Sequence, residues 1–110
     1  MTEVGYILLK EGHLTVDTDW LNEFCRAWKI ASLSVFGSAL RDDFGPSSDI
    51  DLLVDFHPNA AWDFWQLGEL QDQLEAHFGR PVDLVNPENI RNPIKRRRIL
   101  ETQKRIYESR

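Results

Sequence analysis

The sequence predicts a single α/β or α+β domain in which helices stack against a β-sheet. Helical and strand-like patterns alternate along only 110 residues, which is the length of one small domain. Hydrophobic residues make up 42% of the chain and charged residues 28%, a balance typical of a globular protein rather than a disordered one. A lone cysteine rules out an internal disulfide, and no apolar run approaches the roughly 20 residues that span a bilayer. We therefore expect residues 1–110 to form one domain in the reducing cytoplasm, with no membrane contact.

The N-terminal part of the sequence predicts a helix that follows a segment of undetermined secondary structure. Residues 1–16 are the least determined segment, because the short apolar run Tyr6–Leu9 suits a strand and a helical turn equally. Asp17 offers an N-cap oxygen, and a helix is predicted from there to about Lys29. Its buried stripe has helical spacing: Leu21, Phe24, Cys25 and Trp28. Cys25 on this stripe is expected to pack in the core rather than to react.

Two strands and a helix follow. The alternating residues 33–36 stop at Gly37 and predict a strand that runs into a tight turn. Residues 49–56 carry the strongest strand signal, and their apolar stretch is typical of a central strand covered on both faces. A second helix is predicted along the apolar positions Leu67, Leu70, Leu74 and Phe78, closed by Gly79.

The end of the chain predicts a short strand and a last helix. Residues 81–85 form the strand. Asn92 can cap a helix with Pro93 at its first position, and we expect this basic C-terminal helix to span residues 92–108. Its apolar stripe would hold Ile99, Gln103, Ile106 and Tyr107.

Asp49 and Asp51 place two carboxylates in an otherwise apolar strand. The strand period of two turns both side chains to one face, with Cβ atoms about 6 to 7 Å apart. Such a pair suits two bridged Mg²⁺ or Mn²⁺ ions, since hard cations prefer oxygen ligands. A solvated strand edge or a turn cap is the alternative for an isolated Asp-x-Asp. The pair Gly37-Ser38, which follows a strand and could approach a phosphate, favours the functional interpretation.

Gly37-Ser38, the ten residues Ala39 to Ser48, and Asp49-Ile50-Asp51 together resemble the signature of the polymerase-β-type nucleotidyltransferase superfamily. The similarity is strongest to its minimal nucleotidyltransferases, called MNT proteins, and extends from about Leu21 to Tyr107. The resemblance implies a nucleotidyltransferase fold, with a small mixed β-sheet packed against about four helices.

The resemblance also assigns roles to individual residues. Gly37 and Ser38 would bind the triphosphate, and Asp49 and Asp51 would hold two Mg²⁺ ions, or Mn²⁺ in their place. Asp83 fills the position of a third metal-binding carboxylate that activates the attacking hydroxyl. Arg41 matches an arginine often seen in the family and could reach a phosphate, although a surface salt bridge suits it almost equally. Asp42 departs from the family pattern, which often has glycine there.

The implied reaction transfers AMP from ATP to a hydroxyl, and the implied acceptor is a tyrosine of a HEPN-domain toxin, which makes this chain an antitoxin. Two alternatives stay open: a non-catalytic antitoxin that acts by occlusion, and a small-molecule or antibiotic nucleotidyltransferase with a separate substrate-binding subunit. The sequence leaves the base preference and the oligomeric state open, including a homo-oligomer.

Charge is divided unevenly along the chain. Residues 1–90 carry 5 basic and 16 acidic side chains, whereas residues 91–110 carry 8 basic and 2 acidic ones. The basic segment suggests nucleic acid at first sight, but the acidic body would repel it. We expect the segment to bind nucleotide phosphates or an acidic partner, with a solvated helix face as the alternative.

Overall fold

The computed structural model describes residues 6–9, 14–37 and 48–109. Its elements follow one another in the order β1 (Tyr6–Leu9), β2 (Leu14–Asp17), α1 (Thr18–Ala27), β3 (Ile30–Phe36), β4 (Ile50–Phe56), α2 (Phe64–Phe78), β5 (Val82–Val85), the 3₁₀ helix η2 (Pro87–Asn89), α3 (Pro93–Thr102) and β6 (Lys104–Glu108). The ambiguous run Tyr6–Leu9 is thus a strand, and it pairs antiparallel with β2.

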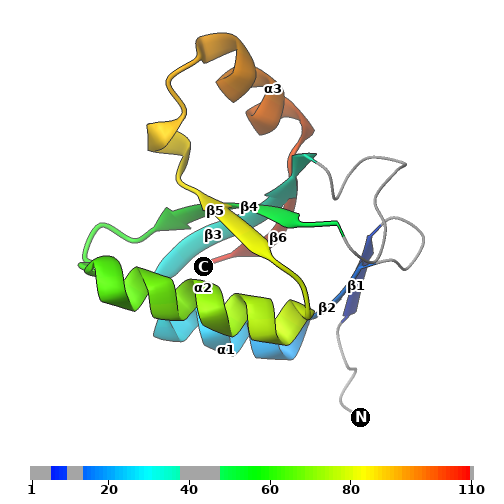
Figure 1. Ribbon diagram of the computed structural model, residues 1–110, viewed down its shortest axis with the longest axis vertical. Coiled ribbons are helices and arrows are strands. Elements are labelled where there is room, and N and C mark those ends of the chain that lie inside the picture. Colours follow the sequence, from blue (N-terminus) through cyan, green and yellow to red (C-terminus); the bar gives the residue numbers. More distant parts are fainter. Residues whose placement is uncertain (1–5, 10–13, 38–47, 110) are drawn as a thin grey trace.

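A four-stranded mixed sheet forms the centre of the molecule, with strand order β5-β4-β3-β6 (Figure 1). β3 pairs antiparallel with both β4 and β6, while β4 and β5 run parallel. The parallel pair is joined through α2, as a parallel connection requires a crossover. The predicted mixed sheet is confirmed, and β4 is one of its two central strands, as its apolar sequence indicated.

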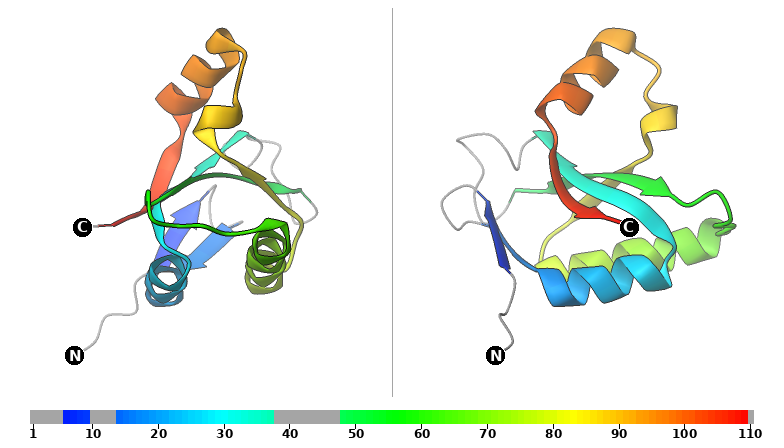
Figure 2. Two further views of the ribbon diagram at one scale, coloured as in Figure 1. Left: turned by 90° about the vertical axis from the view of Figure 1, so that its left-hand side faces the viewer. Right: turned by 180° about the vertical axis from the view of Figure 1, so that it is seen from behind.

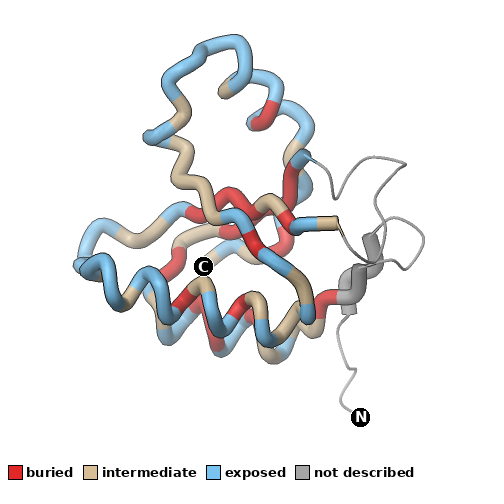
Figure 3. Tube along the Cα trace, viewed as in Figure 1, coloured by how far each residue is buried: buried red, intermediate tan, exposed pale blue. Residues whose placement is uncertain are grey.

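Helices α1 and α2 lie side by side under one face of the sheet (Figure 2). The main core fills the space between these layers, and its buried side chains follow both helices and the central strands (Figure 3). Cys25 lies in this core, as predicted, and burial raises the pKa of its thiol to about 12. The thiol is therefore held in its protonated, unreactive form near neutral pH.

The opposite face of the sheet is covered only in part, by the η2–α3 segment (Figure 1). A small cluster of Phe36, Leu53 and Ile99 is buried there, with Val85 and Ile90 packed against it. Leu53 lies two residues from Asp51 and two from Asp55, and residues two apart in a strand point to the same face. The face of the sheet covered by the η2–α3 segment therefore also carries the carboxylates of β4.

The prediction of one basic helix over residues 92–108 is wrong in its second half. α3 ends at Thr102, Gln103 caps it in an extended conformation, and the chain continues as β6 along β3. β3 would otherwise be left as an edge with unpaired backbone groups, so tertiary pairing overrides the helical stripe. Ile106 is still buried, but in the core of the sheet.

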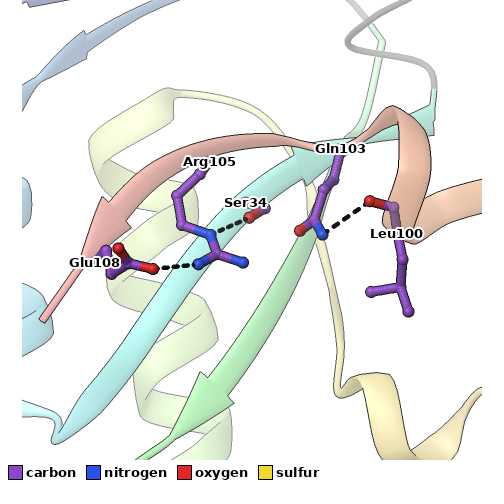
Figure 4. Close-up of polar contacts among 5 residues, drawn as sticks. All are labelled: Ser34, Leu100, Gln103, Arg105 and Glu108. Carbon is purple, nitrogen blue, oxygen red and sulfur yellow. Dashed lines mark hydrogen bonds and ion pairs between the residues drawn. The ribbon is translucent and has the colours of Figure 1, made fainter.

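Side-chain hydrogen bonds mark this junction (Figure 4). Gln103 donates to the carbonyl of Leu100 at 3.1 Å, while Arg105 donates to the Ser34 hydroxyl at 3.3 Å and pairs with Glu108 at 2.5 Å. Ser34 is 1% exposed, so Arg105 supplies a partner to a buried hydroxyl.

The helix boundaries follow local capping rules. Asp17 accepts the amide hydrogens of Asp19 and Trp20 at the start of α1, as predicted. Asp63 and Gln66 form a reciprocal capping box at the start of α2, and Gly79 ends that helix in the left-handed conformation. Within the described part of the chain there are three α-helices, and none of them is long and apolar enough to cross a membrane.

Candidate active site

Gly37 and Asp51 approach each other closely at the end of β3. Gly37 has a φ of +66°, a left-handed conformation that non-glycine residues rarely adopt. A Cβ added to Gly37 would lie 2.5 Å from the Oδ2 atom of Asp51, well inside van der Waals contact. The glycine is therefore required twice, by its backbone conformation and by the carboxylate beside it.

Asp51 and Asp83 are direct neighbours across the parallel strands β4 and β5. Their Cα atoms are register partners, so the two strand backbones place them about 4.8 Å apart with side chains on the same face. Asp49 lies just before β4 and is exposed. Among the described residues, however, no three His, Cys, Asp or Glu side chains gather closely enough to hold a metal ion together.

Contacts from α2 and from the turn after it fix the starts of both strands. Glu75 accepts the amide hydrogen of Val82 at 2.8 Å, and Gln71 donates to the Val82 carbonyl at 2.8 Å. These bonds satisfy backbone groups of the edge strand directly before Asp83. Arg80 donates to the Ser48 carbonyl at 3.1 Å, which fixes the chain directly before Asp49.

A cavity of about 620 Å³ opens beside Asp51 and Asp83. Its walls come from the end of β3, the start of β4, the strand β5, the segment that leads into α3, and α3 itself: Phe36, Asp51, Asp83, Val85, Asn89, Ile90, Arg91, Asn92, Lys95 and Ile99. Carboxylates, amides and cations thus meet around an apolar base, an arrangement suited to a polar ligand with a flat apolar part.

The structure brings together three of the predicted site residues, namely Gly37, Asp51 and Asp83. Asp49 lies two residues from Asp51, but it belongs to no three-carboxylate cluster in the part of the chain that the structure describes. Ser38 and Arg41 lie outside the described residues.

The sequence reasoning missed which residues of the C-terminal segment line the cavity. Arg91 and Lys95 do so, whereas Arg97 pairs with Glu101 on an exposed surface. A usable signal was present, because Lys95 precedes the apolar Ile99 by four residues and so shares its helix face.

Comparison with known proteins places this geometry in a family. The nucleotidyltransferase domain family matches residues 19–107, which include every element from α1 to most of β6. The chain belongs to the nucleotidyltransferase domain family. The predicted fold and class of enzyme are thereby confirmed.

Relatives of this nucleotidyltransferase are named protein adenylyltransferases. A Methanocaldococcus jannaschii protein, provisionally named a protein adenylyltransferase, is 36% identical over 67% of this chain and 74% of its own length. Protein adenylyltransferase MntA of Thermococcus cleftensis is 35% identical over 59% of this chain and 64% of its own length.

Solved structures of toxin–antitoxin complexes share the fold. A toxin–antitoxin crystal structure with AMP-PNP matches with a TM-score of 0.65 and 20% identity, over 86% of this chain and 76% of that one. The MntA–HepT toxin–antitoxin structure matches with a TM-score of 0.56 and 19% identity, over 84% of this chain and 70% of that one.

The donor set of this nucleotidyltransferase fits a hard divalent cation. Asp51 and Asp83 supply adjacent carboxylate oxygens, the ligand type that Mg²⁺ prefers, and the bare backbone of Gly37 lets the Asp51 carboxylate lie against it. Two like charges directly opposite on neighbouring strands destabilise each other, so a cation between them would remove this repulsion.

Proposed function

We propose that this chain is an Mg²⁺-dependent protein adenylyltransferase that transfers AMP from ATP to a hydroxyl, a tyrosine in our hypothesis, of a HEPN-type toxin, and thereby acts as an antitoxin. The pairing of Asp51 with Asp83 beside Gly37 carries this proposal. The MntA relative and the MntA–HepT fold match support it. We place the reaction in the cytoplasm, where ATP is available.

Each residue has a role in this reaction. Gly37 and Ser38 would bind the triphosphate through backbone amides, with Arg41 as a further phosphate contact. Asp49, Asp51 and Asp83 would hold two Mg²⁺ ions, with Mn²⁺ as a substitute. Bound there, the ions would lower the pKa of the acceptor hydroxyl and neutralise charge on the leaving pyrophosphate.

The transfer itself is an in-line displacement at the α-phosphorus of ATP. The acceptor oxygen forms a bond to that phosphorus while the bond to the bridging oxygen of pyrophosphate breaks. Asp83 lies on the edge strand β5 and is exposed, which supports its assignment as the group that would take the hydroxyl proton. The enzyme forms no covalent intermediate in this scheme.

An exposed aromatic surface next to the site supports a protein acceptor. Two aromatic side chains at the start of α2 face outward: Phe64 is 80% exposed and Trp65 is 81% exposed. Trp62 instead turns inward and donates to the Trp28 carbonyl at 2.8 Å. Phe64 lines an apolar cavity that shares Asn89 with the cavity at Asp51 and Asp83. A partner seated on this surface would therefore lie beside the carboxylates.

The test is direct adenylylation of the protein encoded by the neighbouring gene. The two proteins are incubated with ATP and Mg²⁺, and intact-mass spectrometry is used to detect an adenylyl group on the neighbour. We expect this mass gain with the wild type and none with the Asp49→Asn/Asp51→Asn variant. Asp55→Asn is the matched control, because Asp55 is an exposed carboxylate further along the same strand.

Three results would separate the alternatives. If the neighbour gains no mass and the double variant still inhibits it, the chain acts by occlusion. A gain on a small hydroxylated molecule in place of the protein would favour the small-molecule enzyme. A gain that persists when EDTA removes divalent cations would contradict the metal-dependent mechanism.

A further inference from the structure

The cavity of the candidate active site is also lined by two basic side chains, for which the metal-binding role of the carboxylates gives no reason. Arg91 and Lys95 line the same cavity as Asp51 and Asp83. Both are exposed, and neither side chain makes a hydrogen bond or an ion pair anywhere in the described ranges 6–9, 14–37 and 48–109. The cavity therefore holds two positive charges that the described protein leaves unneutralised.

Two of the three arginines that follow Lys95 in α3 bond elsewhere, and the third, Arg98, is exposed and does not line the cavity. Arg96 donates to the Pro87 carbonyl at 3.1 Å and so ties α3 to η2. Arg97 bonds Glu101 at 2.9 Å, with 81% of its side chain exposed. The fold thus gives the four consecutive basic residues different surroundings: Arg96 bonds the backbone, Arg97 forms a surface ion pair, Arg98 is exposed, and Lys95 lines the cavity.

Helix phase explains why Lys95 is the member that reaches the cavity. At about 100° per residue, Lys95 and Ile99 lie on one face of α3, while Arg97 points about 200° away from Lys95. Ile99 is buried against Phe36 and Leu53, which turns this face toward the sheet. Arg91 lies on the chain just before the cap residue Asn92, at the rim of the same cavity.

We propose that Arg91 and Lys95 bind the phosphate chain of the nucleotide, opposite the carboxylates that would hold the metal ions. This inference rests on the proposed function for the identity of the ligand. The positive charge of the bound ions would be shared between the triphosphate and the carboxylates that hold them, so cations on the facing wall complete the neutralisation of the triphosphate. An acidic acceptor segment is the competing ligand, and the test separates the two.

Equilibrium binding tests this assignment without relying on turnover. Titration calorimetry with ATP and with inorganic tripolyphosphate, both with Mg²⁺, compares the wild type with Arg91→Gln, Lys95→Gln and Arg97→Gln. Each of the first two variants should raise both dissociation constants about tenfold, since each removes one charge-assisted contact. Arg97→Gln removes the same charge from the same helix and should leave both constants within about twofold.

Two further variants exclude trivial causes. Lys95→Arg keeps the charge and should restore most of the tripolyphosphate affinity, which a purely structural role of Lys95 would not predict. Thermal unfolding of every variant should stay within a few degrees of the wild type. Equal binding by wild type, Arg91→Gln and Lys95→Gln would overturn the inference, as would an equal loss in Arg97→Gln.

The same titrations distinguish this inference from the proposed function. A wild type that binds tripolyphosphate through Arg91 and Lys95 but adenylylates no partner would contradict the transferase proposal and support the phosphate site. Transfer with unchanged nucleotide constants in both variants, but with a raised KM for the acceptor protein, would assign the cations to the acceptor and overturn the inference. A wild type that binds neither ligand would also overturn it.

Discussion

Gly37 leaves space for a carboxylate oxygen of Asp51 where any other residue would place its Cβ, 2.5 Å from that oxygen. We predict that Gly37→Ala causes a large loss of transfer activity and only a small loss of stability. Left-handed backbone at an alanine costs about 1 to 2 kcal/mol, whereas displacement of Asp51 by about 1 Å can lower transfer about 100-fold. Urea denaturation and the adenylylation assay measure the two effects separately.

Two other glycines provide matched controls for this substitution. Gly79 has a similar φ of +70° but no atom near its Cβ position, so Gly79→Ala should lose stability and keep activity. Gly68 lies inside α2 with open space around it, and Gly68→Ala should stabilise the protein by about 0.5 to 1 kcal/mol. Normal transfer by Gly37→Ala would contradict the assignment of Asp51.

We predict that Asp83→Asn makes the metal-free protein slightly more stable. We also predict that it reduces the rise in melting temperature caused by Mg²⁺ and ATP. In EDTA the substitution removes repulsion between register partners, a gain of up to about 1 kcal/mol. With Mg²⁺ and ATP the wild type should melt at a higher temperature, because a ligand that binds only the folded state stabilises it, and the variant should respond less.

Asp55→Asn is the control for this measurement, because Asp55 pairs with Ser32 rather than with another carboxylate. It should leave both the EDTA stability and the response to Mg²⁺ near those of the wild type. A full Mg²⁺ response in Asp83→Asn would remove Asp83 from the metal site.

The stability of the protein should depend more on Arg105 in β6 than on the adjacent residue Lys104. Arg105→Ala removes the guanidinium that donates to the buried Ser34 hydroxyl, and we expect a loss of about 1 kcal/mol in the free energy of unfolding. Lys104→Ala on the same strand should change that free energy by less than about 0.5 kcal/mol. If Ser34→Ala fully suppresses the effect of Arg105→Ala in a double-mutant cycle, the hydrogen bond is its cause.

His77 should make the protein less stable in mild acid. Its ring stacks on Trp20 with centroids 3.6 Å apart, and desolvation lowers its pKa below the usual 6.5 despite the opposing charge of Asp17. As pH falls below 6.5, the unfolded chain binds a proton before the native state does, so the stability that this His contributes is lost. His77→Phe keeps a stacked ring without a titrating group, and its unfolding free energy should decline less between pH 7 and pH 5.

Much of the site was predictable because its signals are local. Gly37 and the Asp-x-Asp at Asp49 and Asp51 depend on turn geometry and strand alternation, which neighbouring residues determine. The partnership of Asp83 came from a family resemblance, and the parallel register with Asp51 gives it a structural basis. The local signal failed at residues 104–108, where a helical stripe of apolar residues was also compatible with a strand.

The sequence alone determined the fold class, the start of α1, the bounds of β4 to within one residue, and the pair Asp49 and Asp51, because capping and periodicity act within a few residues. It predicted β3 only from residue 33, three residues after the strand begins. Only the tertiary structure decided that β6 completes the sheet beside β3, and that Lys95 reaches the cavity while Arg97 does not. Both outcomes depend on how distant segments satisfy each other's backbone groups and apolar faces. The pairing of β6 with β3 leaves no regular spacing in the chain from which it could be predicted. The spacing of Lys95 and Ile99 does indicate a shared helix face, but not what that face meets.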